Sequence, residues 1–194
     1  MRKTTMTHLF STGCAVTLLM CRTSTRRAKA LAVVVALSFS ALSPAAAQTM
    51  GTASGLPLPR FVSLKTDRVN LREGPSKDHP SLWIYQRAGL PVEITAEFEI
   101  WYKIRDSEGT EGWVLHSLLS GRRTGLVGPS KASANITLYS KPSNTAAASA
   151  ALQPGVIGSI KNCDGQWCRI FGEDFDGYIP QTNLWGVYPD EKVN

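Results

Sequence analysis

The chain has 194 residues, of which 43% are hydrophobic and 19% are charged, and its formal net charge is +6. Six of its 21 basic residues and none of its 15 acidic residues lie in residues 1–47, so the remainder carries 15 charges of each sign. A protein that neutralises nucleic-acid phosphates needs a surplus of Lys and Arg, and this balance therefore argues against a nucleic-acid partner.

Residues 1–47 have the pattern of a secretory signal peptide. A basic cluster at 22–29 precedes an apolar run at 30–42, and Ala45-Ala46-Ala47 then supplies the small residues that signal peptidase requires. A spanning helix needs about 20 apolar residues, so this shorter run predicts no stable membrane span. We expect the mature chain to start near Gln48 and to be periplasmic or secreted.

Two features of this leader leave alternatives open. The ordinary export pattern would begin at Met20, so Met1 is either the start of a long basic region or a misassigned start. The pair Arg26-Arg27 is also found in twin-arginine signals, although the residues that follow it lack the apolar character of such signals.

The remainder of the chain is predicted to be all-β. Residues 48–59 are punctuated by Gly and Pro and are expected to form a flexible N-terminal segment. From Arg60 onward, short runs with strand composition alternate with turn signals, and no run has a helical period. In the first half of this region the runs lie at 68–72, 82–87, 91–98, 101–106 and 112–115.

The same pattern occurs twice, at a spacing that falls from 67 to 65 residues. The matching positions are Val69-Asn70-Leu71 with Ile136-Thr137-Leu138, Trp101 with Trp167, and Gly112-Trp113-Val114 with Gly177-Tyr178-Ile179. A small barrel is an economical way to hide the edges of so short a sheet. We therefore expect two β-barrels, at 60–124 and 134–190, separated by a linker at 125–133.

The sequence CDGQWC contains the two cysteines that remain after the leader. In an oxidising compartment, Cys163 and Cys168 should form a disulfide across the turn signal Asp164-Gly165. A metal site would need further Cys or His residues at ligand spacing, and redox pairs have two intervening residues where this pair has four. The sequence thus predicts a structural disulfide and no metal site.

A tryptophan occupies the same strand position in both copies. Residues two apart in a strand share a face, so Trp101 should lie with Lys103 and Trp167 with Arg169, on the side opposite the core. Exposed aromatic side chains beside polar groups are suited to ligand binding. The alternative is that each tryptophan covers the end of its barrel or the seam between the barrels.

These motifs resemble bacterial SH3 domains. The resemblance is carried by VNLREGPS, by the Trp-x-x-Ile strand, and by GWV followed by a turn that contains Leu119. It implies recognition of a cell-wall component, a peptide or a partner protein, and it adds Trp113 to the candidate ligand-binding residues. The segment GYIPQTNL is similar to the groove of eukaryotic SH3 domains, which adds Tyr178 and Pro180, although the first copy has Leu115 in place of the proline.

Residues able to carry catalysis are few. Once the leader is removed, the histidines His79 and His116 lie in the first copy and both cysteines lie in the second, so no nucleophile and base are paired in sequence. We expect a non-enzymatic binding protein without a cofactor. The alternatives are a structural or scaffolding protein of the periplasm and a targeting subunit of a cell-wall hydrolase.

Overall fold

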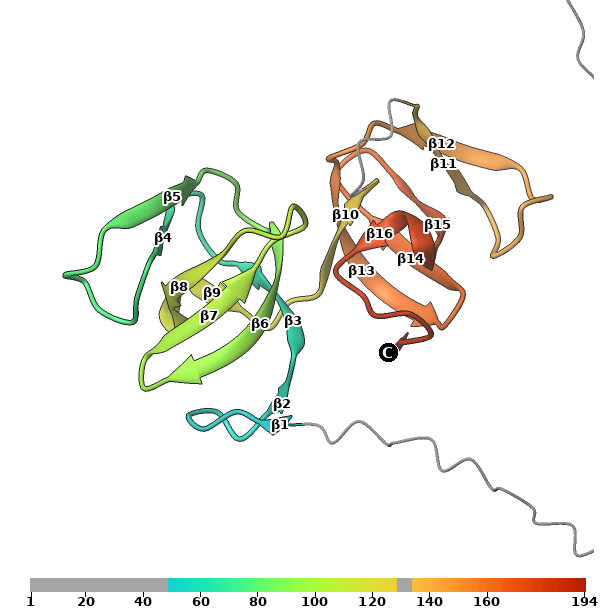
Figure 1. The fold of residues 1–194 in the computed structure, drawn as a ribbon. Helices are drawn as coiled ribbons and strands as arrows, with labels where there is room; N and C mark the ends of the chain where they lie inside the picture. Colours follow the sequence, from blue (N-terminus) through green and yellow to red (C-terminus); the bar gives the residue numbers. More distant parts are fainter. Residues whose placement is uncertain (1–48, 129–133) are drawn as a thin grey trace, which may run out of the picture. The chain divides into compact units, whose positions relative to one another are not determined.

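The computed structural model describes residues 49–128 and 134–194, which form two small β-barrels (Figure 1). The predicted signal peptide, with its cleavage site after Ala47, lies outside the described residues. Within the described residues there is no α-helix, which confirms the predicted all-β fold. No helix in this part of the chain has the length and hydrophobicity needed to cross a membrane.

The first barrel, residues 60–120, is an antiparallel sheet with the strand order β5-β4-β8-β7-β6-β3-β9. Its strands are β3 (Arg60–Leu64), β4 (Val69–Arg72), β5 (Ser81–Tyr85), β6 (Pro91–Phe98), β7 (Trp101–Arg105), β8 (Glu111–Leu115) and β9 (Leu119–Ser120). A short 3₁₀ helix, η1 (His116–Leu118), connects the last two strands.

The second barrel, residues 124–193, has the strand order β12-β11-β15-β14-β13-β10-β16, and one further strand pairs with β13. Its strands are β10 (Thr124–Val127), β11 (Ile136–Tyr139), β12 (Ala148–Leu152), β13 (Ile157–Asp164), β14 (Trp167–Phe171), β15 (Asp176–Pro180), β16 (Leu184–Trp185) and β17 (Lys192–Val193). The 3₁₀ helix η2 (Gln181–Asn183) takes the place of η1.

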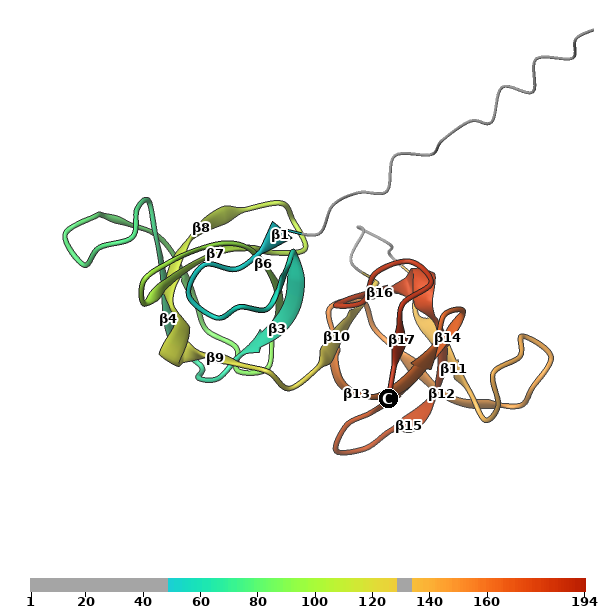
Figure 2. The ribbon, with the colours of Figure 1, turned by 90° about the horizontal axis from the view of Figure 1, so that it is seen from below.

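The two barrels repeat the same topology. Adding seven to each strand number in the order of the first barrel gives the strand order of the second barrel. Strand β4 therefore corresponds to β11, and β7 to β14. In both barrels a hairpin, β4–β5 or β11–β12, extends away from the other strands (Figures 1 and 2). The internal repeat predicted from the sequence is therefore confirmed as a repeat of structure.

Each barrel has its own hydrophobic core, formed by alternate residues of its strands. Ile104 and Val114 are fully buried in the first barrel, and the corresponding Ile170 and Ile179 are fully buried in the second. Burying an aliphatic side chain of this size contributes about 1.5–3 kcal/mol. The period-two alternation of the sequence thus determines which face of each sheet points inward.

A repeated glycine brings two strands of each barrel close together. A Cβ atom at Gly112 would lie 2.6 Å from Cγ of Leu71, and one at Gly177 would lie 3.0 Å from Cβ of Leu138. Strand β8 can therefore lie against β4, and β15 against β11, only where no side chain intervenes. This requirement explains the glycine shared by GWV and GYI.

The linker predicted at 125–133 begins inside the second barrel. Residues 125–127 belong to strand β10, which pairs with β13 and β16, and residues 129–133 lie outside the described part of the chain. A glycine suits position 125 of β10, because a Cβ atom there would lie only 3.1 Å from Cδ2 of Leu184. The connection between the barrels is residues 121–123, where no strand is assigned.

The segment 48–59, predicted to be flexible, forms a hairpin of β1 (Thr49–Met50) and β2 (Pro57–Leu58) over the part described. The carboxylate of Glu97 accepts hydrogen bonds from the amides of Ala53 and Ser54, at 3.0 and 2.8 Å, and from the Ser54 hydroxyl at 2.6 Å. Arg60 also donates to this carboxylate at 2.7 Å. Glu97 thus attaches the hairpin to the first barrel.

The two barrels also contact each other through side chains of the described residues. Phe61 of the first barrel packs edge-on against Trp185, with ring centroids 5.1 Å apart, and against Tyr188 at 4.7 Å. The Tyr188 hydroxyl donates to the buried carboxylate of Glu93 at 2.8 Å. An aromatic cluster and a hydrogen bond to a buried carboxylate therefore join the two sheets.

The predicted disulfide is present. Cys163 on β13 lies directly opposite Cys168 on β14, and their sulfur atoms are bonded. The predicted turn lies between them: Gly165 has φ 105°, and the Asp164 carboxylate accepts hydrogen bonds from the amides of Gln166 and Trp167. Both cysteines are buried against the core of the second barrel.

We expect alkylation of the unreduced, denatured protein, once the predicted leader with Cys14 and Cys21 is removed, to add no mass, because Cys163 and Cys168 are oxidised. Reduction should lower the free energy of unfolding of the second barrel by about 2 kcal/mol, the loop-closure contribution of so short a ring. Intact mass spectrometry and urea unfolding with and without reductant measure the two effects. Two reactive thiols in material from an oxidising compartment would contradict the prediction.

Candidate functional site

Strands β7 and β8 place the predicted site residues of the first barrel on one face. Trp101 lies opposite Leu115 and Lys103 lies opposite Trp113, while Ile104 points into the core. The prediction that Trp101 and Lys103 share the outward face is therefore correct.

The predicted exposure of Trp101 is wrong, because this side chain is only 6% exposed. It lines a cavity of about 240 Å³ that is bounded by side chains from the start of β4, the loop after β4, the end of β8, and η1. These elements cover the outer face of β7 where Trp101 lies. We call this space the Trp101 cavity; its lining residues are Arg68, Asn70, Arg72, Lys77, Trp101, Leu115 and Leu118.

The loop 73–80 beside the cavity is held in place by Arg72. Nη1 of Arg72 donates to the carbonyl oxygens of Lys77 and His79, at 3.0 and 2.6 Å. His79 itself is an exposed loop residue, and His116 is exposed at the start of η1. The Trp101 cavity is therefore bordered on one side by a loop whose position depends on a cavity residue.

Lys103 and Trp113 lie beside the cavity and do not line it. Lys103 forms an ion pair with Glu111 at 2.7 Å, which lowers the pKa of that carboxyl group. Trp113 is half-buried, and its backbone pairs with both Lys103 and Arg72. Lys103 and Trp113 thus lie on the same outward face as Trp101 but outside its cavity.

In the second barrel, Trp167 is less buried than Trp101. It lies opposite Pro180 and packs edge-on against Tyr139, with ring centroids 5.7 Å apart. Arg169 donates two hydrogen bonds of 2.8 Å to Asp176 and lies 5.8 Å from the ring centroid of Tyr178. The structure therefore brings the four predicted residues together as two neighbouring pairs.

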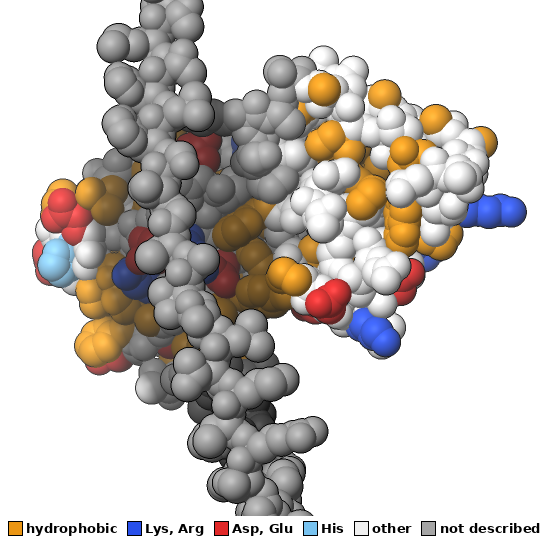
Figure 3. All heavy atoms as spheres, turned by 45° about the vertical axis from the view of Figure 1, so that its right-hand side comes forward, with side chains coloured by type: hydrophobic (Ala, Val, Ile, Leu, Met, Phe, Trp, Pro, Cys, Tyr) orange, Lys and Arg blue, Asp and Glu red, His pale blue; other side chains and the backbone are white. Residues whose placement is uncertain are grey.

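The residues around the two tryptophans differ in charge. Matching strands and turns place Asn135 where the first barrel has Arg68, Tyr139 where it has Arg72, and Asn144 where it has Lys77. The face of the second barrel seen in Figure 3 is mainly apolar or uncharged, with few charged side chains. Three cations line the cavity of Trp101, and uncharged residues stand at the three corresponding positions of the second barrel.

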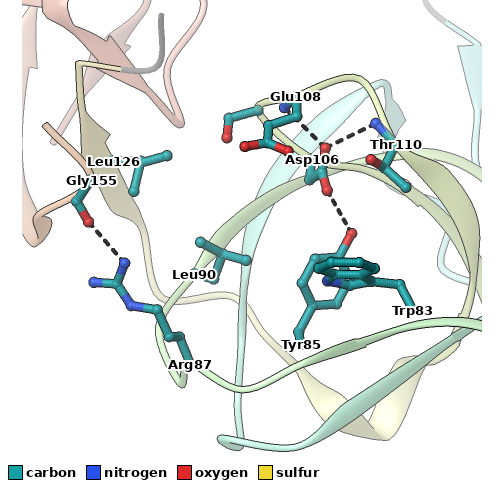
Figure 4. Close-up of a pocket in the computed structure, with 10 residues that line it drawn as sticks. Trp83, Tyr85, Arg87, Leu90, Asp106, Glu108, Thr110, Leu126 and Gly155 are labelled. Carbon is teal, nitrogen blue, oxygen red and sulfur yellow. Dashed lines mark hydrogen bonds between the residues drawn. The ribbon is translucent and has the colours of Figure 1, made fainter. Parts of the chain in front are cut away.

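A second pocket, of about 340 Å³, is lined by Trp83, which is not among the predicted site residues (Figure 4). Trp83 on β5 is 59% exposed and lines this pocket together with Tyr85, whose hydroxyl donates to Asp106 at 2.9 Å. Burial and this hydrogen bond raise the pKa of Tyr85. A comparison of the two copies points to Trp83, because the large apolar residues Leu82-Trp83-Ile84 stand where the second copy has the small residues Ser149-Ala150-Ala151.

No group of three or more His, Cys, Asp or Glu side chains arranged to hold a metal ion occurs in residues 49–128 and 134–194. The Asp106 carboxylate accepts hydrogen bonds from the Tyr85 hydroxyl and from the amides of Glu108 and Thr110. These bonds fix the turn between β7 and β8, so Asp106 has a structural role at the second pocket.

Comparison with known families matches the family described as bacterial SH3 domain twice, at residues 65–121 and 132–186. Comparison with curated proteins gave no match. Among solved structures, NlpC1 from Trichomonas vaginalis is 18% identical with a TM-score of 0.30, and the match covers 70% of this chain and 48% of that one. An NlpC/P60 family protein from Bacillus cereus is 11% identical with a TM-score of 0.29, and the match covers 64% and 55%. The chain thus spans about half the length of these proteins.

Proposed function

Because the chain belongs to the bacterial SH3 domain family, we propose that it is an exported, non-enzymatic protein that binds peptidoglycan through the Trp101 cavity of its first barrel. Peptidoglycan is the ligand of the cell envelope that the family resemblance favours. The observation that carries the proposal is a small cavity with an indole wall, apolar sides and a polar rim.

The composition of the Trp101 cavity supports ligand binding. Its aromatic and aliphatic walls, formed by Trp101, Leu115 and Leu118, can cover the apolar part of a ligand. Asn70 and the basic residues at its rim supply polar groups that can orient the ligand. The loop 73–80 is held by Arg72, so part of the rim is already ordered.

Two observations support the proposals of export and of a non-enzymatic role. The disulfide Cys163–Cys168 is of a kind that persists in oxidising compartments. As a disulfide, these cysteines cannot act as a thiolate nucleophile, and the described histidines, His79 and His116, lie in the other barrel. This arrangement of cysteines and histidines favours ligand binding over catalysis.

Co-sedimentation with purified peptidoglycan tests the proposal. We expect the protein to pellet with the polymer and to remain in the supernatant without it. A pull-down from envelope extract distinguishes the alternatives, because a scaffold or a targeting subunit should retain a protein partner. Failure to pellet with peptidoglycan, together with retention of a protein partner, would contradict the proposed function.

A further inference from the structure

The Trp101 cavity has an excess of positive charge. Arg68, Arg72 and Lys77 line it, and none of the ion pairs within residues 49–128 and 134–194 involves these three side chains. We infer that the cavity binds a peptide that bears a free carboxylate next to a small apolar side chain. This inference rests on the proposed function and specifies which part of the envelope ligand is recognised.

Arg72 is already positioned to receive an anion. Its Nη1 makes the two hydrogen bonds that hold loop 73–80, which fixes the guanidinium plane. Its Nη2 and Nε have no hydrogen-bond partner within the described ranges 49–128 and 134–194. Because a guanidinium offers five N–H donors in a fixed planar arrangement, the remaining ones can bind a carboxylate without further ordering of the side chain.

The apolar walls narrow the choice of ligand. An inorganic phosphate would meet the cations but would leave Trp101, Leu115 and Leu118 without an apolar partner. The volume of about 240 Å³ lies below the usual range of ligand pockets, about 300–1,000 Å³, so the bound group is small. A peptide carboxylate beside a residue such as alanine satisfies both requirements.

The second barrel does not offer the same chemistry. The uncharged residues Asn135, Tyr139 and Asn144 stand where the first barrel has its three cations, and Arg169 is already paired with Asp176. We therefore assign the recognition of the carboxylate to the first barrel.

Titration of the purified protein with N-acetyl-alanyl-alanine, as the free acid and as the C-terminal amide, tests the inference. We expect the acid to bind at least 10-fold more tightly than the amide, because only the acid forms charge-assisted hydrogen bonds with the cavity. Inorganic phosphate should not displace it at equal concentration. Equal affinity for acid and amide, displacement by phosphate, or no binding of the acid would each overturn the inference.

The variant Arg68→Asn/Lys77→Asn gives the first barrel the residues found in the second. Both side chains are exposed, so we expect the fold to be retained and the affinity for the acid to fall at least 10-fold. The control Lys141→Asn/Lys161→Asn removes the same charge from exposed positions of the second barrel and should bind like the wild type. Equal losses in both variants would show a general charge effect and overturn the inference.

Peptidoglycan whose carboxyl groups have been amidated separates this inference from the proposed function. The wild type should pellet with native peptidoglycan and lose most of this binding with the amidated polymer. Equal pelleting with both polymers would overturn the inference and leave the proposed function intact, whereas pelleting with neither would overturn both.

Discussion

Replacing Trp101 by alanine is expected to lower the free energy of unfolding of the first barrel by about 3 kcal/mol or more, the usual cost of truncating a buried aromatic side chain. Trp101 is only 6% exposed, and the outer face of β7 around it is covered by η1 and the loop 73–80. The truncation would enlarge the existing cavity instead of removing an exposed binding platform. Urea unfolding, followed by circular dichroism, measures the loss.

Trp83→Ala is the matched control, because it removes the same side chain from a position that is 59% exposed. We expect it to lower the free energy of unfolding by less than about 1 kcal/mol, as for a surface substitution. The half-buried Trp167 should give an intermediate loss. Similar small losses for Trp101→Ala and Trp83→Ala would contradict the buried position of Trp101.

The second large effect is expected at Glu97, whose replacement by glutamine should release the N-terminal hairpin from the first barrel. Burial alone would raise the pKa of this carboxyl group, but hydrogen bonds from Ser54, Arg60 and Ala53 outweigh it and lower the pKa from 4.5 to about 2. This shift corresponds to about 3 kcal/mol of stabilisation by the charged form. Hydrogen exchange at the amides of Ala53 and Ser54 should therefore be about 100-fold less protected in Glu97→Gln at neutral pH.

The pH dependence follows from the sign of the shift. Since the pKa of Glu97 is lower in the folded protein, its contribution is complete above about pH 4.5 and is lost as the pH falls towards 2. The difference in stability between the wild type and Glu97→Gln should vanish over this range. The exposed Glu173→Gln serves as the control. A difference that persists unchanged at pH 2 would show that the charge of Glu97 does not hold the hairpin.

The repeat and the alternation of apolar residues predict much of the fold. The matching of Trp101 with Trp167 and of GWV with GYI predicts the shared topology, because equivalent residues occupy equivalent strands. The two-residue period correctly separates Trp101 and Lys103 from Ile104. The disulfide is also predictable, because Cys163 and Cys168 flank a local turn signal.

The features that sequence reasoning missed depend on contacts between distant segments. Trp101 is covered by residues that precede and follow it by many positions, so the strand period shows its face but not its burial. The hairpin 49–58 is held by Glu97, more than 40 residues away. Gly125 resembles a linker residue in composition, but the close approach of Leu184 explains why a glycine occupies this strand.

The grouping of cations at the Trp101 cavity was not predictable for the same reason. Arg68 precedes β4 and Arg72 is its last residue, whereas Lys77 lies in the loop beyond it, and only the turn of that loop brings the three around one cavity. The contrast between the two copies was visible in the sequence, because Asn135, Tyr139 and Asn144 are aligned with these cations. Only the structure shows that the three positions line one cavity.

The central claim, that the first barrel binds peptidoglycan through the Trp101 cavity, is tested most directly by the indole N–H signals of the five tryptophans in an NMR titration with soluble peptidoglycan fragments. Each signal reports on one site: Trp101 on the cavity, Trp113 on the neighbouring face, Trp83 on the second pocket, Trp167 on the second barrel, and Trp185 on the contact between the barrels. We expect the largest shift at Trp101, with Trp167 and Trp185 unchanged. An unchanged Trp101 signal, or a largest shift at Trp167, would contradict the claim.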